Sequence, residues 1–122
     1  MKQGFFSSRI WVLRFLYAVH GLAAFFKTEH NAIVYSLATI GVAIFSLVLN
    51  ISATEAIILL IVTGIVWVCE LFNTAIERLA DIVSPQQDMQ IKVVKDVAAA
   101  AVFLSAIIAL IAGLIIFIPK IF

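Results

Sequence analysis

The feature that most limits how this chain can fold is a set of long segments without any charged residue. Residues 31–49 and 97–118 contain no Asp, Glu, Lys or Arg, and residues 56–69 form a third, shorter apolar run. A helix needs about 20 apolar residues to cross the hydrocarbon core of a bilayer. Because backbone polar groups must be satisfied internally in a membrane, we expect all three segments to be helices.

The overall composition also indicates a membrane protein. Of the 122 residues, 65% are hydrophobic and 12% are charged, whereas a soluble domain is about half apolar and a quarter charged. The net charge of +1 and the lack of a basic block give no sign of a nucleic-acid partner. A single cysteine excludes an intrachain disulfide. We identify no removable signal peptide, because Lys2, Arg9 and Arg14 interrupt the N-terminal apolar residues.

The predicted fold is an all-α integral membrane protein with three transmembrane helices and an N-terminal amphipathic surface helix. The surface helix is expected at about residues 7–27, where Arg9, Arg14 and His20 are spread among aromatic side chains. The spans are expected at about residues 31–49, 54–83 and 93–118. The whole chain, 1–122, is then one membrane domain.

The polar connections predict where the helices end and how the chain is oriented. Residues 50–54 predict a tight turn, Ser84 and Pro85 end the second span, and Pro119 ends the third. Lysine and arginine precede the first span, and Arg78, Lys92 and Lys95 flank the loop between the second and third spans, whereas the 50–54 turn has none. By the positive-inside rule, the N-terminus and the 83–95 loop are cytoplasmic and the C-terminus faces away.

The third span contains small residues at four-residue spacing, which are Ala101, Ser105, Ala109 and Gly113. Small residues in such a row allow two helix backbones to approach closely. An alanine-rich span without a partner is the alternative explanation. Because three helices form a thin core, we expect a homo-oligomer.

A row of polar residues continues the second span, and it consists of Glu70, Asn73, Glu77 and Asp81. At about 100° per residue, they fall within an arc of about 80° and share one helix face. At about 1.5 Å per residue, the row is about 16 Å long. Carboxylates inside a membrane are costly and usually functional, and Glu70 lies deepest in the apolar run.

Further polar residues are expected at the same membrane level, namely Glu29, Asn31, Lys95 and Asp96. Carboxylates hold Mg²⁺ together with substrate phosphates, and a lysine can bind phosphate. Glu70 or Asp96 would serve as a general base. The structural alternatives are solvated helix-end charges for Glu77 and Asp81, a surface charge for Glu29, and a helix cap for Lys95 and Asp96.

Several soluble catalytic motifs are missing from the sequence. There is no Walker A motif, no glycine-rich phosphate loop, no Ser-His-Asp arrangement and no zinc-type spacing. A phosphoryl-transfer enzyme with this sequence would therefore not belong to a soluble kinase class.

The segment ELFNTAIERLAD (70–81) followed by KDVAAAAV (95–102) resembles the signature of the small prokaryotic lipid kinases, the diacylglycerol kinase and undecaprenol kinase family. FLYAVHGLAAFFKTEHN (15–31) resembles the surface helix of that family, and GLIIFIPK (113–120) resembles the C-terminal end of its undecaprenol kinase branch. The resemblance implies a homotrimer with active sites shared between subunits. It also implies transfer of the γ-phosphate of Mg-ATP to a lipid hydroxyl at the cytoplasmic face of a bacterial membrane.

The resemblance implies roles for individual residues. Glu70 matches the catalytic base of the family, which takes the proton from the lipid hydroxyl, and Asn73 matches an asparagine that positions the reacting groups. Glu29 and Glu77 match its metal-binding glutamates. Nucleotide contacts are implied for Glu29, Glu77, Asp81, Lys95 and Asp96.

Three segments depart from the family pattern. His20 stands where members usually carry Arg or Lys, and the loop at 84–92 lacks the usual histidine-containing sequence. EHNAIVY (29–35) replaces a more basic E-R-N-x-x-x-H pattern.

The predicted function is that of an ATP-dependent lipid kinase acting on undecaprenol, and diacylglycerol is the alternative substrate. From other classes, an ion- or proton-translocating subunit and a non-catalytic assembly partner remain open. A conduction path should continue polar to the far face, and residues 40–49 and 104–118 offer almost no polar groups.

Overall fold

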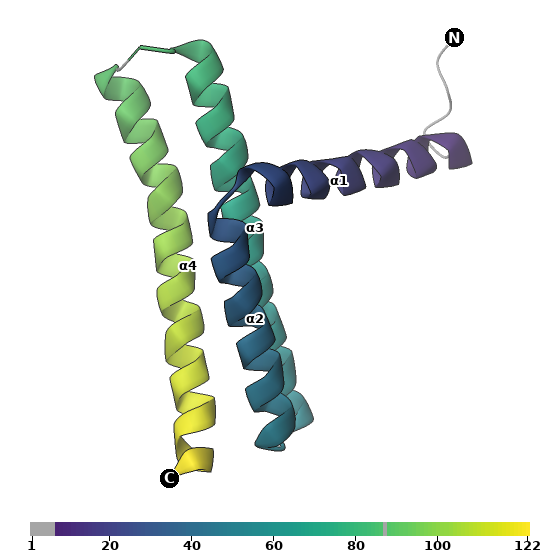
Figure 1. The fold of residues 1–122 in the computed structure, drawn as a ribbon, viewed down its shortest axis with the longest axis vertical. Helices are drawn as coiled ribbons and strands as arrows, with labels where there is room; N and C mark the ends of the chain where they lie inside the picture. The colour runs from purple at the N-terminus through teal and green to yellow at the C-terminus, as the bar shows by residue number, and fades with distance from the viewer. Residues whose placement is uncertain (1–6, 87) are drawn as a thin grey trace. The chain divides into compact units, whose positions relative to one another are not determined.

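The protein consists of four α-helices in a computed structural model that describes residues 7–86 and 88–122. They are α1 (Ser8–Thr28), α2 (Asn31–Val48), α3 (Ala53–Val83) and α4 (Met89–Ile121), as Figure 1 shows. The chain divides into two compact units, Met1–Val34 and Tyr35–Phe122. The predicted all-α fold is confirmed for the described part of the chain.

The first unit contains α1 and the first turn of α2. Phe25 and Ala32 are its buried residues, at 3% and 1% exposure. The Glu29 N–H donates to the Phe25 carbonyl at 3.0 Å, and the Glu29 carbonyl accepts from the Ala32 N–H at 3.3 Å. Length and composition would also allow α1 to cross a membrane. Its predicted position at the membrane surface therefore stays a prediction.

The second unit is built around an antiparallel pair, α3 and α4, joined by a short connection (Figure 1). Apolar side chains from both helices are buried between them, namely Leu59, Val66, Ala80, Ala98, Val102 and Ile116. The α2 helix packs on this pair through the rings of Phe45 and Phe117, whose centroids are 6.0 Å apart. It is also joined to α3 by a hydrogen bond from Trp67 Nε1 to Thr39 Oγ1 at 2.9 Å.

Helices α2, α3 and α4 are each long and apolar enough to cross a membrane. The 31 residues of α3 correspond to about 46 Å at 1.5 Å per residue. This exceeds the hydrocarbon thickness of about 30 Å, so a spanning α3 must extend beyond the hydrocarbon. Apolar side chains such as Leu47 and Ile82, at 79% and 78% exposure, cover the outside. Exposed apolar surface of this extent requires lipid or other subunits around it.

The start and end of α3 follow their sequence signals. The Ser52 hydroxyl accepts from the Glu55 N–H at 3.1 Å, and the Ser52 N–H donates to Glu55 Oε1 at 2.9 Å. This reciprocal pair is a capping box, which satisfies two backbone donors at the helix start. The helix ends at Val83, immediately before Ser84 and Pro85, as predicted.

Both ends of α4 differ from the prediction. The helix begins at Met89 because the Asp88 carboxylate caps it, accepting from the Gln90 N–H at 2.7 Å. The helix cap considered for Lys95 and Asp96 is therefore wrong. The helix also continues past Pro119 to Ile121. Pro119 removes one backbone N–H donor, but it lies in the last turn of the helix, where the Phe122 N–H still bonds to the Ile118 carbonyl at 3.1 Å.

Candidate active site

The polar row on α3 runs from the interior of the unit to its surface. Glu70 is 3% exposed and Asn73 is 9% exposed. Glu77, further along the helix, is half-buried, and Asp81 is exposed. The order of burial agrees with the predicted shared face, on which Glu70 lies deepest.

Glu70 is a carboxylate at the end of an apolar stretch. It lies 15 positions after Glu55 and 11 before Asp81, which corresponds to about 22 Å and about 16 Å along the helix. Burial of a carboxylate is unfavourable unless hydrogen-bond donors surround it. The Tyr35 side chain on α2 lies close to the Glu70 carboxylate. The sequence did not identify Tyr35 as a site residue.

Asn73 and Thr74 carry polar atoms that lack a partner. The Asn73 amide nitrogen lies 3.4 Å from Glu77 Oε1, a long hydrogen bond between residues one turn apart. Within the described residues, Asn73 Oδ1 and Thr74 Oγ1 are buried without any hydrogen-bond partner. Unpaired buried polar atoms are uncommon and unfavourable. Two of them lie on the turn after Glu70, where they are available to a water, a ligand or another chain.

The side-chain oxygen atoms of Asn73 and Glu77 on α3 are suited to bind Mg²⁺ together with phosphate groups of a substrate. Among the residues that the structure describes, no three His, Cys, Asp or Glu side chains form a metal cage. Mg²⁺ usually takes one or two carboxylates together with waters and substrate phosphates. The Glu77 carboxylate and the unpaired Asn73 Oδ1 fit that requirement. Glu29 lies half-buried at the end of α1 in the other unit, and its part in the metal site stays a prediction.

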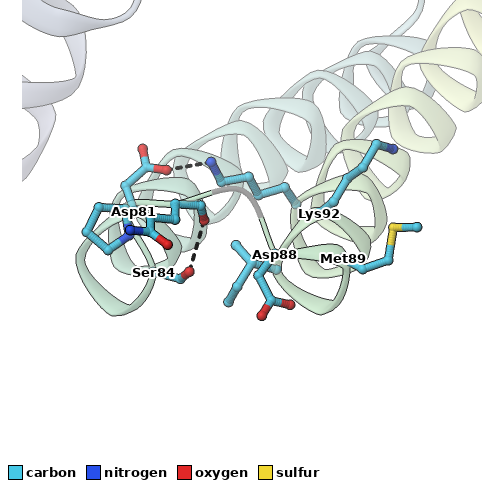
Figure 2. Close-up of a pocket in the computed structure, with 9 residues that line it drawn as sticks. Asp81, Ser84, Asp88, Met89 and Lys92 are labelled. Atoms are coloured by element: carbon cyan, nitrogen blue, oxygen red, sulfur yellow. Dashed lines mark hydrogen bonds and ion pairs between the residues drawn. The ribbon is translucent and has the colours of Figure 1, made fainter.

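A pocket of about 400 Å³ lies where α3 ends and α4 begins. Figure 2 shows Asp81 and Ser84 on the α3 side and Asp88, Met89 and Lys92 on the α4 side. Lys95 also lines the pocket and forms an ion pair with Asp81. The two helices are thus linked by opposite charges at this end.

The structure brings Asp81 and Lys95 together and leaves Asp96 on another side of α4. Asp96 is ion-paired with Lys92 at 2.6 Å, one turn earlier on the same helix, and both side chains are largely exposed. Successive helical residues point about 100° apart, so Lys95 and Asp96 cannot share a face. Lys95 is therefore a paired lysine rather than an isolated cation.

Sequence reasoning missed several polar side chains of this pocket. The sequence indicates only a topology signal for Lys92 and a helix end for Ser84. In the structure the Ser84 hydroxyl donates to the Gln86 carbonyl at 2.9 Å, and Asp88 caps α4. Each belongs to a predicted loop, where sequence alone gives no fixed side-chain position.

The comparison with protein families identifies the chain. A family model described as "Prokaryotic diacylglycerol kinase" matches residues 16–117. The chain belongs to this family. It is therefore a lipid kinase of a family of ATP-dependent integral membrane enzymes.

Two curated relatives of this lipid kinase support the assignment. A protein of Bacillus subtilis (strain 168) named undecaprenol kinase is 35% identical over 106 residues, which cover 87% of this chain and 86% of that protein. A Synechocystis protein (strain ATCC 27184 / PCC 6803 / Kazusa) named diacylglycerol kinase is 32% identical over 103 residues, or 84% of this chain. The match spans only 59% of the Synechocystis protein. No solved structure matched the chain.

Membership of a lipid kinase family gives the α3 row a chemical context. A kinase that phosphorylates a lipid must reach an alcohol in the bilayer and a nucleotide in water. The row provides a buried carboxylate at one end and a charged pocket at the other. It favours an enzyme over the ion-translocating or non-catalytic subunit that the composition alone left open.

Proposed function

We propose that this lipid kinase transfers the γ-phosphate of ATP to the hydroxyl of undecaprenol, giving undecaprenyl phosphate. The reaction would take place at the cytoplasmic face of a bacterial membrane, with the N-terminus and the α3–α4 connection on that side. The observation that carries the proposal is Glu70, a carboxylate only 3% exposed on a helix long enough to cross a membrane. A buried carboxylate of this kind can act on an alcohol held at bilayer depth.

Glu70 is the proposed general base. Its carboxylate accepts the proton of the lipid hydroxyl as the hydroxyl oxygen bonds to the γ-phosphorus. The bond between that phosphorus and the β,γ-bridging oxygen breaks, and ADP leaves with the bond's electrons. Asn73, one turn further along α3, is proposed to orient the reacting groups through its buried side chain. A positioned general base contributes about 10²–10⁴-fold to rate.

Glu77, together with Glu29, is the proposed ligand of Mg²⁺. The metal would neutralise charge on the β- and γ-phosphates. Asp81, Lys95 and Asp96 are proposed to contact the nucleotide. The pocket lined by Asp81 and Lys95 supports this for the first two, because it lies at the exposed end of the same row. The proposed nucleotide contact of Asp96 is supported by the family resemblance alone.

The choice of undecaprenol rests on how the relatives align. The relative named undecaprenol kinase is matched over 86% of its length, and the one named diacylglycerol kinase over 59%. Diacylglycerol, which would give phosphatidic acid, is the alternative acceptor. The C-terminal segment 113–120 also resembles the undecaprenol kinase branch.

A homotrimer with three transmembrane helices and a surface helix per chain is the proposed assembly. Its support is the extensive exposed apolar surface and the unpaired buried atoms of Asn73 and Thr74. Another subunit that contributed to the site would supply their missing partners. The mass of the protein in a detergent of known aggregation number tests this, and a monomeric active enzyme would contradict it.

The decisive experiment offers labelled ATP and Mg²⁺ to the purified protein in mixed micelles that contain one lipid alcohol at a time. Undecaprenol and diacylglycerol are compared at equal surface concentration, with Glu70→Gln as the inactive control. Label in undecaprenol above that in diacylglycerol supports the proposal. A preference for diacylglycerol would support the alternative substrate, and label in neither lipid would overturn the proposed reaction.

A further inference from the structure

A cavity of about 500 Å³ lies between α2, α3 and α4, inside the second unit. Its lining is largely apolar, and the side chains with a hydroxyl group are those of Tyr35, Thr39 and Thr63. Sites that hold one small ligand typically measure about 300–1,000 Å³. The cavity is separate from the charged pocket at the α3–α4 connection, whose lining it does not share.

One face of α3 leads from this cavity to Glu70. Leu59, Thr63 and Val66 line the cavity, and their spacings of four and three residues place them on a single helix face. Glu70 follows Val66 by four positions and continues the same face. The distance along the helix from Leu59 to Glu70 is about 16 Å. The proposed base therefore lies on the face that lines the cavity, one turn beyond its lining.

Aromatic rings from all three helices line the cavity. Trp67 of α3, three positions before Glu70, packs against Tyr35 of α2 with ring centroids 6.1 Å apart. Phe45 of α2 and Phe117 of α4 meet with their centroids 6.0 Å apart. Phe45 lies about 15 Å further along α2 than Tyr35. The cavity is thus bordered by one aromatic contact near Glu70 and by a second one deeper in the unit.

The polar groups at the end near Glu70 are already bonded to each other. Thr39 Oγ1 donates to the backbone carbonyl of Tyr35 at 2.7 Å. The same oxygen accepts from Trp67 Nε1 at 2.9 Å. Polar groups that are satisfied in this way need no water, and apolar cavities stay dry. The space is therefore suited to a hydrocarbon chain.

We propose that this cavity binds the prenyl chain of the lipid alcohol, starting from the units next to its hydroxyl group. The inference rests on the proposed function, which places that hydroxyl at Glu70. A chain that leaves the hydroxyl along the same face of α3 enters the cavity directly. Each unit of a prenyl chain carries a flat double bond and a methyl branch, which pack well against aromatic rings. The aromatic lining therefore favours a prenyl chain over a saturated acyl chain.

Two glycines offer matched variants that test the cavity. Gly41 of α2 belongs to its lining, whereas Gly64 of α3 does not. Both are half-buried, and an added Cβ would meet no atom within 4 Å at either position in the described part of the chain. Leucine also has a higher helix propensity than glycine. Gly41→Leu and Gly64→Leu should therefore both fold, and only the first fills the cavity.

The first measurement is the KM for undecaprenol in mixed micelles. Burial of one methylene group contributes a factor of about four to affinity, so a leucine that displaces part of the chain should raise this KM about tenfold. Turnover at saturating undecaprenol and the KM for Mg-ATP should not change in Gly41→Leu. All three values should stay at those of the parent enzyme in Gly64→Leu.

The second measurement follows binding without catalysis. Trp11 and Trp67 are the two tryptophans of the chain, so Trp67 is the remaining fluorophore in a Trp11→Phe background. A brominated long-chain alcohol should quench its fluorescence, and undecaprenol should reverse the quenching. We expect weaker quenching in Gly41→Leu, full quenching in Gly64→Leu, and full quenching in the inactive Glu70→Gln.

The outcomes separate this inference from the proposed function. An unchanged KM and unchanged quenching in Gly41→Leu, with Glu70→Gln inactive, would overturn the chain site and leave the base in place. A higher KM for diacylglycerol without a higher KM for undecaprenol would identify an acyl chain as the occupant and overturn the proposal. A lower unfolding midpoint with loss of the oligomer in Gly41→Leu would identify a second copy of the chain as the occupant and would also overturn it. Normal turnover in Glu70→Gln would overturn the base, whereas the quenching experiment would still decide the chain site.

Discussion

The α3–α4 pair carries one ion pair near each end, and the two ends differ in what surrounds that pair. At one end Glu55 and Lys120 lie 3.1 Å apart, and their side chains are 27% and 28% exposed. At the other end Asp81 and Lys95 form the pair, and they are 64% and 37% exposed. The more buried pair is therefore the one that lies far from the proposed site.

The contacts of Glu55 are all explained by the ends of the helices. Its carboxylate caps α3 through Ser52 and pairs with Lys120 of α4. On the turns of α3 that lead to Asp81, by contrast, Asn73 Oδ1 and Thr74 Oγ1 are buried without partners within the described chain. Ion pairs thus occur at both ends, and unsatisfied buried atoms mark the end at which a ligand is expected.

The largest expected difference between the two ends is in turnover. Glu70→Gln removes the proposed base and should lower turnover by two or more orders of magnitude, roughly the scale of general-base catalysis. Binding of Mg-ATP should remain, because Glu70 is not proposed to contact the metal. Turnover from initial rates and nucleotide affinity from calorimetry check both statements.

The matched control for that variant is Glu55→Gln at the opposite end of the helix. Glutamine can still complete the capping box, so turnover should stay close to that of the parent enzyme. Near-normal turnover in Glu70→Gln, or an equal loss in Glu55→Gln, would contradict the assignment of the base.

The next effect concerns Glu77 and the metal. Glu77→Gln keeps the shape of the side chain but removes the charge proposed to hold Mg²⁺. We expect the KM for Mg-ATP to rise about tenfold or more, since even residues that only support a metal ligand cost 10- to 100-fold in affinity. Turnover at saturating Mg-ATP should fall less than in Glu70→Gln. A Mg²⁺ titration at fixed ATP measures the effect, and an unchanged midpoint would exclude Glu77 as a ligand.

These predictions depend on structural features, some of which can be predicted from the sequence and some of which cannot. The helices could be predicted from the apolar segments, because a membrane allows few other structures for such a chain. The contact between Asn73 and Glu77 followed from their four-residue spacing on one helix. Burial of Glu70 also followed, because it continues the apolar run of α3.

Other features depend on contacts between helices, which spacing along one helix does not determine. The hydrogen bond between Trp67 and Thr39 requires a particular register of α2 against α3, and that register also places Tyr35 beside Trp67. The pairing of Lys95 with Asp81 likewise depends on how the two helices meet. The sequence predicts a polar loop around Asp88, and only the folded chain shows that its carboxylate caps α4 and starts the helix at Met89.

A smaller effect is expected from the cap of α3. Ser52→Ala removes the hydroxyl that accepts from the Glu55 N–H and should lower the stability of the protein by about 1 kcal/mol, the usual cost of losing such a cap. Turnover of the folded enzyme should not change, because Ser52 lies at the end away from the proposed site. Thermal unfolding in detergent and initial rates below the transition measure the two properties separately. A loss of turnover without a loss of stability would show that this end takes part in catalysis.

The smallest effects on stability and on the KM for Mg-ATP are expected from breaking the two ion pairs. These two variants compare the two ends of the α3–α4 pair directly. Lys120→Met leaves the capping box of α3 intact, so the unfolding midpoint should fall by less than in Ser52→Ala, with unchanged kinetics. Lys95→Met should leave the unfolding midpoint nearly unchanged, because an exposed ion pair adds little stability. It should change the kinetics instead, because the pocket loses a positive charge proposed to contact the nucleotide. The KM for Mg-ATP should rise in Lys95→Met alone. If both variants changed only stability, the Asp81–Lys95 pair would be a second structural clamp, and the proposed nucleotide contacts would have to lie elsewhere on the row.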